Sequence, residues 1–195
     1  MVTRLKLFII IIFVALLQLP LAIRPLAAGE PEPALLVKVS FLLNFLRFTQ
    51  WPPNAFQKPD QQLDLAVIGN TPIAAQIKKS LEGQLVKDNK TVQVTVYPDL
   101  QLWQQTGKMP HALFLSNDMA KQWAEILPLL ATAPVLTMAD FPDFCAQGGV
   151  LNLVRDGDRI RFEANPEAAK KASLTLNAQM LQLAEIVSTQ RNQTP

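Results

Sequence analysis

Short apolar runs alternate with helix-like segments through the middle of the chain, and this alternation constrains the fold more than any other feature of the sequence. The runs have the length of buried strands and lie at residues 65–68, 91–97, 112–115 and 134–138. Helical periodicity separates them, at residues 72–82, after Asp99 and at residues 119–130, where Asn117 or Asp118 is the expected N-cap. The sequence therefore predicts a three-layer α/β/α sandwich with a mainly parallel central sheet.

A β-hairpin is expected after these strands, in residues 149–163. Asp156-Gly157 can supply the positive φ angles of a two-residue turn, which places Arg155 opposite Asp158. This register pairs Leu153 with Ile160, Leu151 with Phe162, Asn152 with Arg161 and Val154 with Arg159. Because the apolar side chains then share one face, we expect a C-terminal antiparallel hairpin at the sheet edge, with charged residues facing outward.

Apolar helices are expected on both sides of this region. One begins at Pro33, covers residues 34–48 and stops at Trp51-Pro52-Pro53. It has few polar residues, so it is either buried on most sides or docked against a partner, and we favour burial. A second helix begins at Asn165-Pro166, and a final amphipathic helix places one apolar stripe inward, formed by Leu176, Met180, Leu183 and Val187.

The N-terminus has the layout of a signal peptide. Arg4 and Lys6 precede a run without charges at residues 7–23, and the small residues Ala27, Ala28 and Gly29 follow. The run is short for a membrane-spanning helix, although an uncleaved anchor remains an alternative. We therefore predict a signal peptide at residues 1–28, one domain at residues 34–190 and export to the periplasm.

The apparent basicity of the chain belongs to this leader. The 195 residues carry 18 basic and 16 acidic side chains, a formal charge of +2. Without Arg4, Lys6 and Arg24, 15 basic and 16 acidic residues remain. No cluster of basic and aromatic residues stands out in the rest, so we expect no nucleic-acid partner.

The reactive side chains are few, which argues against most catalytic and metal chemistry. One His and one Cys cannot form a zinc cluster or an intramolecular disulfide. We therefore predict no enzyme activity and no catalytic, metal-binding or cofactor-binding residue. Four features remain weak candidates, and each has a commoner structural explanation: the Gly69-Asn70-Thr71-Pro72 loop as a helix cap, His111 as a buried histidine, and Asp140 and Asp143 as turn caps.

Cys145 lies among aromatic and apolar residues directly before the hairpin. In an oxidising compartment such a cysteine could join two copies as a homodimer, or it could stay buried as a small hydrophobic residue. Its neighbours favour the buried thiol.

Several segments, in order, resemble the YfiR family of periplasmic proteins. They are residues 41–52, which end in Trp51-Pro52, then Gly148-Gly149, then Ile160-Arg161-Phe162-Glu163-Ala164-Asn165, followed by an apolar C-terminal segment. The resemblance extends over about residues 34–187. The resemblance also implies a disulfide-controlled switch, because the type member of the family has several cysteines, but a chain with Cys145 alone cannot form an intramolecular disulfide.

The resemblance implies a regulator that binds the periplasmic sensor domain of an inner-membrane signalling protein and represses it. Diguanylate cyclases, which make cyclic-di-GMP, are the partners that we expect, and sensor kinases are a second possibility. On the predicted hairpin, Arg159, Arg161 and Glu163 with the nearby Asn152 are the expected partner-binding residues. The rival interpretation is a periplasmic protein that binds small solutes beyond the carboxyl ends of the strands, near Gly69, Ser116 and Ala139.

Overall fold

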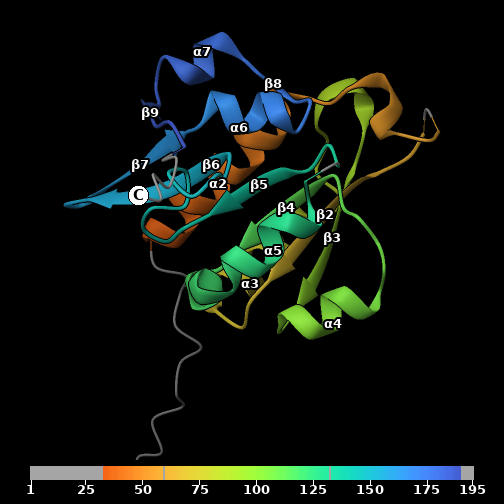
Figure 1. Cartoon of the computed structure of the whole chain (residues 1–195), viewed down its shortest axis with the longest axis horizontal. Coiled ribbons are helices and arrows are strands. Elements are labelled where there is room, and N and C mark those ends of the chain that lie inside the picture. The colour runs from red at the N-terminus through yellow and green to blue at the C-terminus, as the bar shows by residue number, and fades with distance from the viewer. Residues whose placement is uncertain (1–32, 59, 132, 190–195) are drawn as a thin grey trace, which may run out of the picture. The chain divides into compact units, whose positions relative to one another are not determined.

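A seven-stranded, mainly parallel sheet forms the centre of the protein (Figure 1), in the order β3-β2-β4-β5-β6-β7-β9. The computed structural model describes residues 33–58, 60–131 and 133–189, so the predicted signal peptide lies outside the described residues. The strands are β2 (Leu63–Ile68), β3 (Val92–Tyr97), β4 (Ala112–Leu115), β5 (Leu136–Ala139), β6 (Leu151–Asp156), β7 (Arg159–Ala164) and β9 (Glu185–Ile186). In the sheet order from β3 to β6, each strand is parallel to the next. β6 and β7 form the antiparallel hairpin. The predicted sheet is confirmed.

Helices cover both faces of this sheet, because successive side chains of a strand point to opposite sides. α2 (Pro33–Phe48) and α3 (Pro72–Leu81) pack on the face that presents Leu65 and Phe114. α4 (Leu100–Gln105) and α5 (Trp123–Leu129) pack on the face that presents Leu113 and Leu115. The α/β/α layering is therefore as predicted. Among the described residues, no helix combines the length and the hydropathy that a membrane span requires.

The outer position of α2 limits its burial to one side. Val39, Leu42, Phe45 and Leu46 are buried, but three apolar residues on the rest of the surface, Leu36, Val37 and Phe48, are 42–46% exposed. The expectation that this helix is buried on most sides is therefore wrong. A helix in an outer layer contacts the sheet with one stripe only, whatever its composition.

The hairpin has the predicted faces but a different register. Asp156 lies opposite Arg159 and Leu153 opposite Phe162, a shift of two residues from the prediction. The loop is Gly157-Asp158, and Gly157 has a φ of 58°, as a turn with glycine at its first position requires. Because a shift of two keeps each side chain on its face, the outward strip is preserved. β9 pairs with Glu163 and Ala164, so β9 rather than β7 is the last strand of the sheet.

The segment before α5 is also more irregular than predicted. Residues 117–122 form a 3₁₀ helix, η3 (Asn117–Gln122), and the α-helix begins at Trp123. Ser116 is the N-cap residue of η3 and makes no side-chain cap bond, while the carboxylate of Asp118 accepts a hydrogen bond from the backbone N–H of Asn70. The expected caps Asn117 and Asp118 thus lie inside the helical segment, and Asp118 bonds to a neighbouring loop instead of capping the helix.

The C-terminal segment differs most from the prediction. α6 (Pro166–Lys171) begins where expected, and the Asn165 side chain accepts a hydrogen bond from the N–H of Ala168. The long final helix is replaced by β8 (Thr175–Leu176), the single turn α7 (Ala178–Leu181) and β9. β8 pairs with β1 (Thr49–Gln50), directly after α2. Pairing with strands outweighs helical periodicity here, and Leu183 is 79% exposed instead of packed inward.

Candidate functional site

The outward face of the hairpin carries the charged residues expected to contact a partner. Arg159 and Arg161 are exposed on β7, and Glu163 on the same strand is half-buried. Alternation along the strand keeps all three side chains on one face. We call these three residues the hairpin strip.

Arg161 is held by an acidic residue that the predicted register did not place beside it. Its Nε donates to Asp156 Oδ2 at 2.8 Å across the hairpin. Both side chains are more than half exposed, so this ion pair contributes little to stability. An incoming carboxylate can therefore replace Asp156 at small cost. Asp156 is a possible partner of Arg161 in the sequence, but the predicted turn placed this residue in the loop instead of on the strand.

Asn152, predicted to be part of the contact surface, is fully buried. Its Nδ2 donates to the backbone oxygen of Phe141 at 2.9 Å and to Glu163 Oε2 at 3.0 Å. Asn152 therefore orients Glu163 from below and does not itself reach the surface. Within the part of the chain that the structure describes, its Oδ1 is buried and has no hydrogen-bond partner.

The inner face of the hairpin is fixed to α2 by aromatic packing. The centroid of the Phe162 ring lies 5.0 Å from that of Phe45 and 5.6 Å from that of Phe41. Phe162 is buried, as are Leu151 and Leu153 on β6. The hairpin strip is thus carried by a strand whose other face belongs to the main core.

In the rival interpretation, a small solute would bind in the crevice beyond the ends of β2 and β4. In the structure, hydrogen bonds of the protein itself cross this crevice. Strand order reverses between β2 and β4, and the loops after these strands meet there. Asn70 N–H donates to Asp118, and Thr71 Oγ1 donates to Ser116 Oγ at 3.0 Å. At Gly69, which has a φ of 131°, a Cβ would lie 2.6 Å from Asp118 Oδ1. The Asp118 carboxylate thus occupies the place of an anionic ligand at the start of α3.

His111 has a structural environment. Its Nδ1 accepts a hydrogen bond from Asp64 N–H at 3.0 Å, so the proton resides on Nε2, which faces the Ala55 oxygen at 3.2 Å. Phe56 stacks on the ring at 4.3 Å. Burial lowers the pKa of His111 below its ordinary value of 6.5, and the nearby Asp64 carboxylate opposes this only in part.

We expect His111 to make the fold less stable in acid. Since its pKa is lowered in the folded state, the unfolded chain takes up the proton first as the pH falls below 6.5, and protonation also removes the Nδ1 acceptor. The contribution of His111 to the free energy of unfolding should be constant above this pH and fall below it, until the folded-state pKa is passed. Urea titrations of wild type and His111→Asn between pH 8 and 5 test this. An unchanged pH dependence in the variant would contradict it.

The remaining candidates also have structural partners. Cys145 is fully buried, and burial raises the pKa of its thiol, so it remains protonated and out of reach of a second chain. Asp140 pairs with Lys38 of α2 at 2.7 Å, which ties that helix to the end of β5. Asp143 adopts a φ of 62° in the following turn. Sequence reasoning missed the Lys38–Asp140 pair, since a lone lysine in an apolar helix gives no sign of its partner.

When the sequence is compared with known protein families, the matched residues cover most of this fold. A family model described as YfiR/HmsC-like matches residues 36–185. The match begins within α2, ends within β9 and includes the whole hairpin, and therefore every residue of the hairpin strip.

Proposed function

Because the chain belongs to the YfiR/HmsC-like family, we propose that it is a periplasmic regulator that binds the sensor domain of an inner-membrane signalling protein and represses it. Family membership supports a regulatory role in diguanylate cyclase signalling. In this proposal the partner is a diguanylate cyclase, and a sensor kinase is the second candidate. The predicted signal peptide would bring the chain to the compartment in which such sensor domains lie.

The observation that carries the proposal is the family match over residues 36–185, and the hairpin strip is the contact surface that we infer. Its Arg159 and Arg161 are exposed, while Glu163 is held in one orientation by Asn152. A strand that is anchored on its inner face offers these charges with little loss of conformational entropy on binding. The strip is suited to a partner surface that presents carboxylates to the arginines.

Charge reversal of the strip should release the partner. In the native host, deletion of the gene should raise cyclic-di-GMP, and the wild-type protein should restore the original level. The double variant Arg159→Glu/Arg161→Glu should fail to restore it, because reversed charges at an interface weaken binding by roughly tenfold or more. Mass-spectrometric measurement of cyclic-di-GMP provides the readout.

The matched control reverses two exposed lysines that lie outside the strip, Lys79 near the end of α3 and Lys87 before β3, as Lys79→Glu/Lys87→Glu. It should act as wild type, provided that immunoblots show equal amounts of both variants in the periplasm. Full repression by the Arg159→Glu/Arg161→Glu variant would refute the strip as the contact surface. Unchanged cyclic-di-GMP on deletion would refute the cyclase as the partner.

A further inference from the structure

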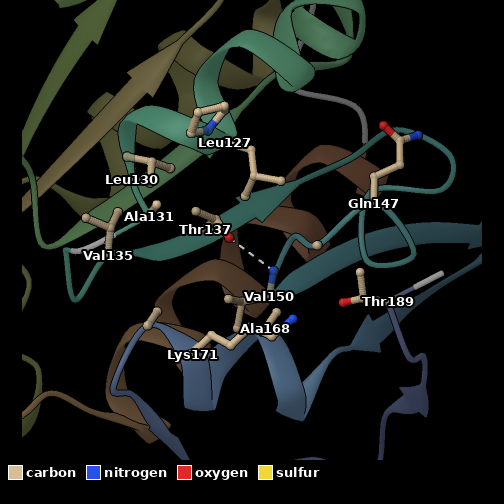
Figure 2. Close-up of a pocket in the computed structure, with 13 residues that line it drawn as sticks. Leu127, Leu130, Ala131, Val135, Thr137, Gln147, Val150, Ala168, Lys171 and Thr189 are labelled. Carbon is tan, nitrogen blue, oxygen red and sulfur yellow. Dashed lines mark hydrogen bonds between the residues drawn. The ribbon is translucent and has the colours of Figure 1, made fainter. Parts of the chain in front are cut away.

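An apolar cleft of about 310 Å³, lined by none of the strip residues, lies between the end of α5 and α6. Figure 2 shows Leu127, Leu130 and Ala131 above it and Ala168 and Lys171 below it. Val135 at the approach to β5 and the loop that leads into β6 complete the walls. With Thr189 after β9, five segments of the chain thus enclose a concave space near the lower limit of small-molecule sites.

Glycine at position 148 helps to keep this cleft open. Gly148 lines the cleft with a φ of 93°, a value that side chains with a Cβ rarely adopt, and a Cβ there would lie 3.3 Å from Leu127 Cδ2. Any larger residue would both strain the loop and crowd the wall. Gly148 is one of the residues on which the family resemblance rests.

The hydroxyl groups in the cleft already have protein partners. Thr137 Oγ1 accepts the N–H of Val150 at 3.0 Å, as Figure 2 shows, and Thr189 Oγ1 accepts from Asn165 Nδ2 at 2.8 Å. Bonded in this way, they leave the walls largely apolar. A ligand is therefore held there mainly by burial of its own apolar surface.

Lys171 supplies the one charge among the lining residues. It is exposed at the end of α6, and within the described residues its ammonium group has no hydrogen bond or ion pair. Its stem can lie along the apolar wall while the ammonium group remains at the mouth. The cleft thus combines an apolar interior with one unpaired positive charge.

We propose that this cleft binds a small amphipathic carboxylate, whose hydrocarbon part enters the cleft and whose carboxylate pairs with Lys171. A neutral apolar molecule would use the walls alone, and a highly charged anion would meet a single lysine and no other cationic side chain among the lining residues. One carboxylate on an unbranched hydrocarbon body matches both features. The inference concerns a different surface from the hairpin strip and does not depend on the proposed function.

Calorimetric titration of the purified exported protein with octanoate and with octan-1-ol tests the proposal. Octanoate, kept below its micelle-forming concentration, should bind with 1:1 stoichiometry. Lys171→Gln should weaken octanoate binding about tenfold and leave octan-1-ol binding unchanged, because it removes a charge-assisted hydrogen bond and spares the walls. Ala131→Phe, which adds a ring at an exposed position of the wall, should weaken the binding of both probes.

Lys170→Gln is the matched control, since this neighbouring lysine does not line the cleft. It should bind octanoate as wild type does, and all three variants should retain the wild-type melting temperature. No octanoate binding at millimolar concentration would overturn the proposal. So would equal binding by Lys171→Gln and wild type, or equal losses from Lys170→Gln and Lys171→Gln.

Discussion

Phe162→Ala is expected to lower the free energy of unfolding by about 3–5 kcal/mol, as truncation of a buried phenylalanine does. Phe162 is 3% exposed and packs against Phe41 and Phe45 of α2. The substitution leaves a cavity between the hairpin and this helix. Since small domains have a total stability of about 5–15 kcal/mol, the loss should be plain in a urea titration monitored by circular dichroism.

Ile160→Ala is the matched control for this substitution. Ile160 lies two residues earlier on the same face of β7 but is half-buried, so its truncation should cost clearly less. Equal losses at the two positions would show that the aromatic contact with α2 does not anchor the hairpin.

Gly149→Ala is expected to be nearly as harmful, by about 3 kcal/mol, although it adds a single methyl group. A Cβ at Gly149 would lie 2.2 Å from Cε1 of Phe144. The Phe144 ring cannot easily move, because it is fully buried between Trp123 and Phe141, whose ring centroids lie 4.6 and 5.2 Å from its own. Thermal and urea unfolding of the variant measure the loss.

Gly107→Ala separates this steric effect from backbone strain. Gly107 has a φ of 61°, and a Cβ there would meet no atom within 4 Å beyond its two chain neighbours, so its substitution should cost about 1–2 kcal/mol through the backbone alone. Gly149 is not among the glycines with positive φ, so its requirement is packing. A Gly149→Ala variant no less stable than Gly107→Ala would contradict this account.

The sheet was predictable because its strands have clear local signals. Runs such as residues 65–68 and 112–115 are apolar without interruption, as strands covered on both faces must be, and helical segments lie between them. The faces of the hairpin were predictable for a similar reason, since alternation fixes which side chains share a side even when the register is wrong by two residues.

The C-terminal segment was not predictable from local pattern. Leu176, Met180, Leu183 and Val187 have helical spacing, but β8 and β9 find partners in β1 and β7, which are distant in the sequence. Backbone pairing with these strands decides the conformation, and periodicity carries no information about such partners.

The arrangement of the residues in the proposed contact surface was predictable in part. The outward direction of Arg159 and Arg161 follows from alternation, whereas the burial of Asn152 depends on the loop that contains Phe141, which covers this side chain and accepts its hydrogen bond. Because asparagine is polar, we expected the Asn152 side chain to be exposed. The position of this loop in the fold buries it instead. The apolar cleft has no local signal at all, because its walls come from five separate segments.

Site-specific photo-crosslinking in intact cells tests the central claim most directly. A photoreactive amino acid is placed at Arg159 in the hairpin strip, and in a second strain at Lys79 on α3 as the control. We predict a crosslinked product at Arg159 that mass spectrometry identifies as an inner-membrane signalling protein, joined through its periplasmic domain, and no such product at Lys79. Failure to capture such a protein at Arg159, or equal capture at both positions, would contradict the account.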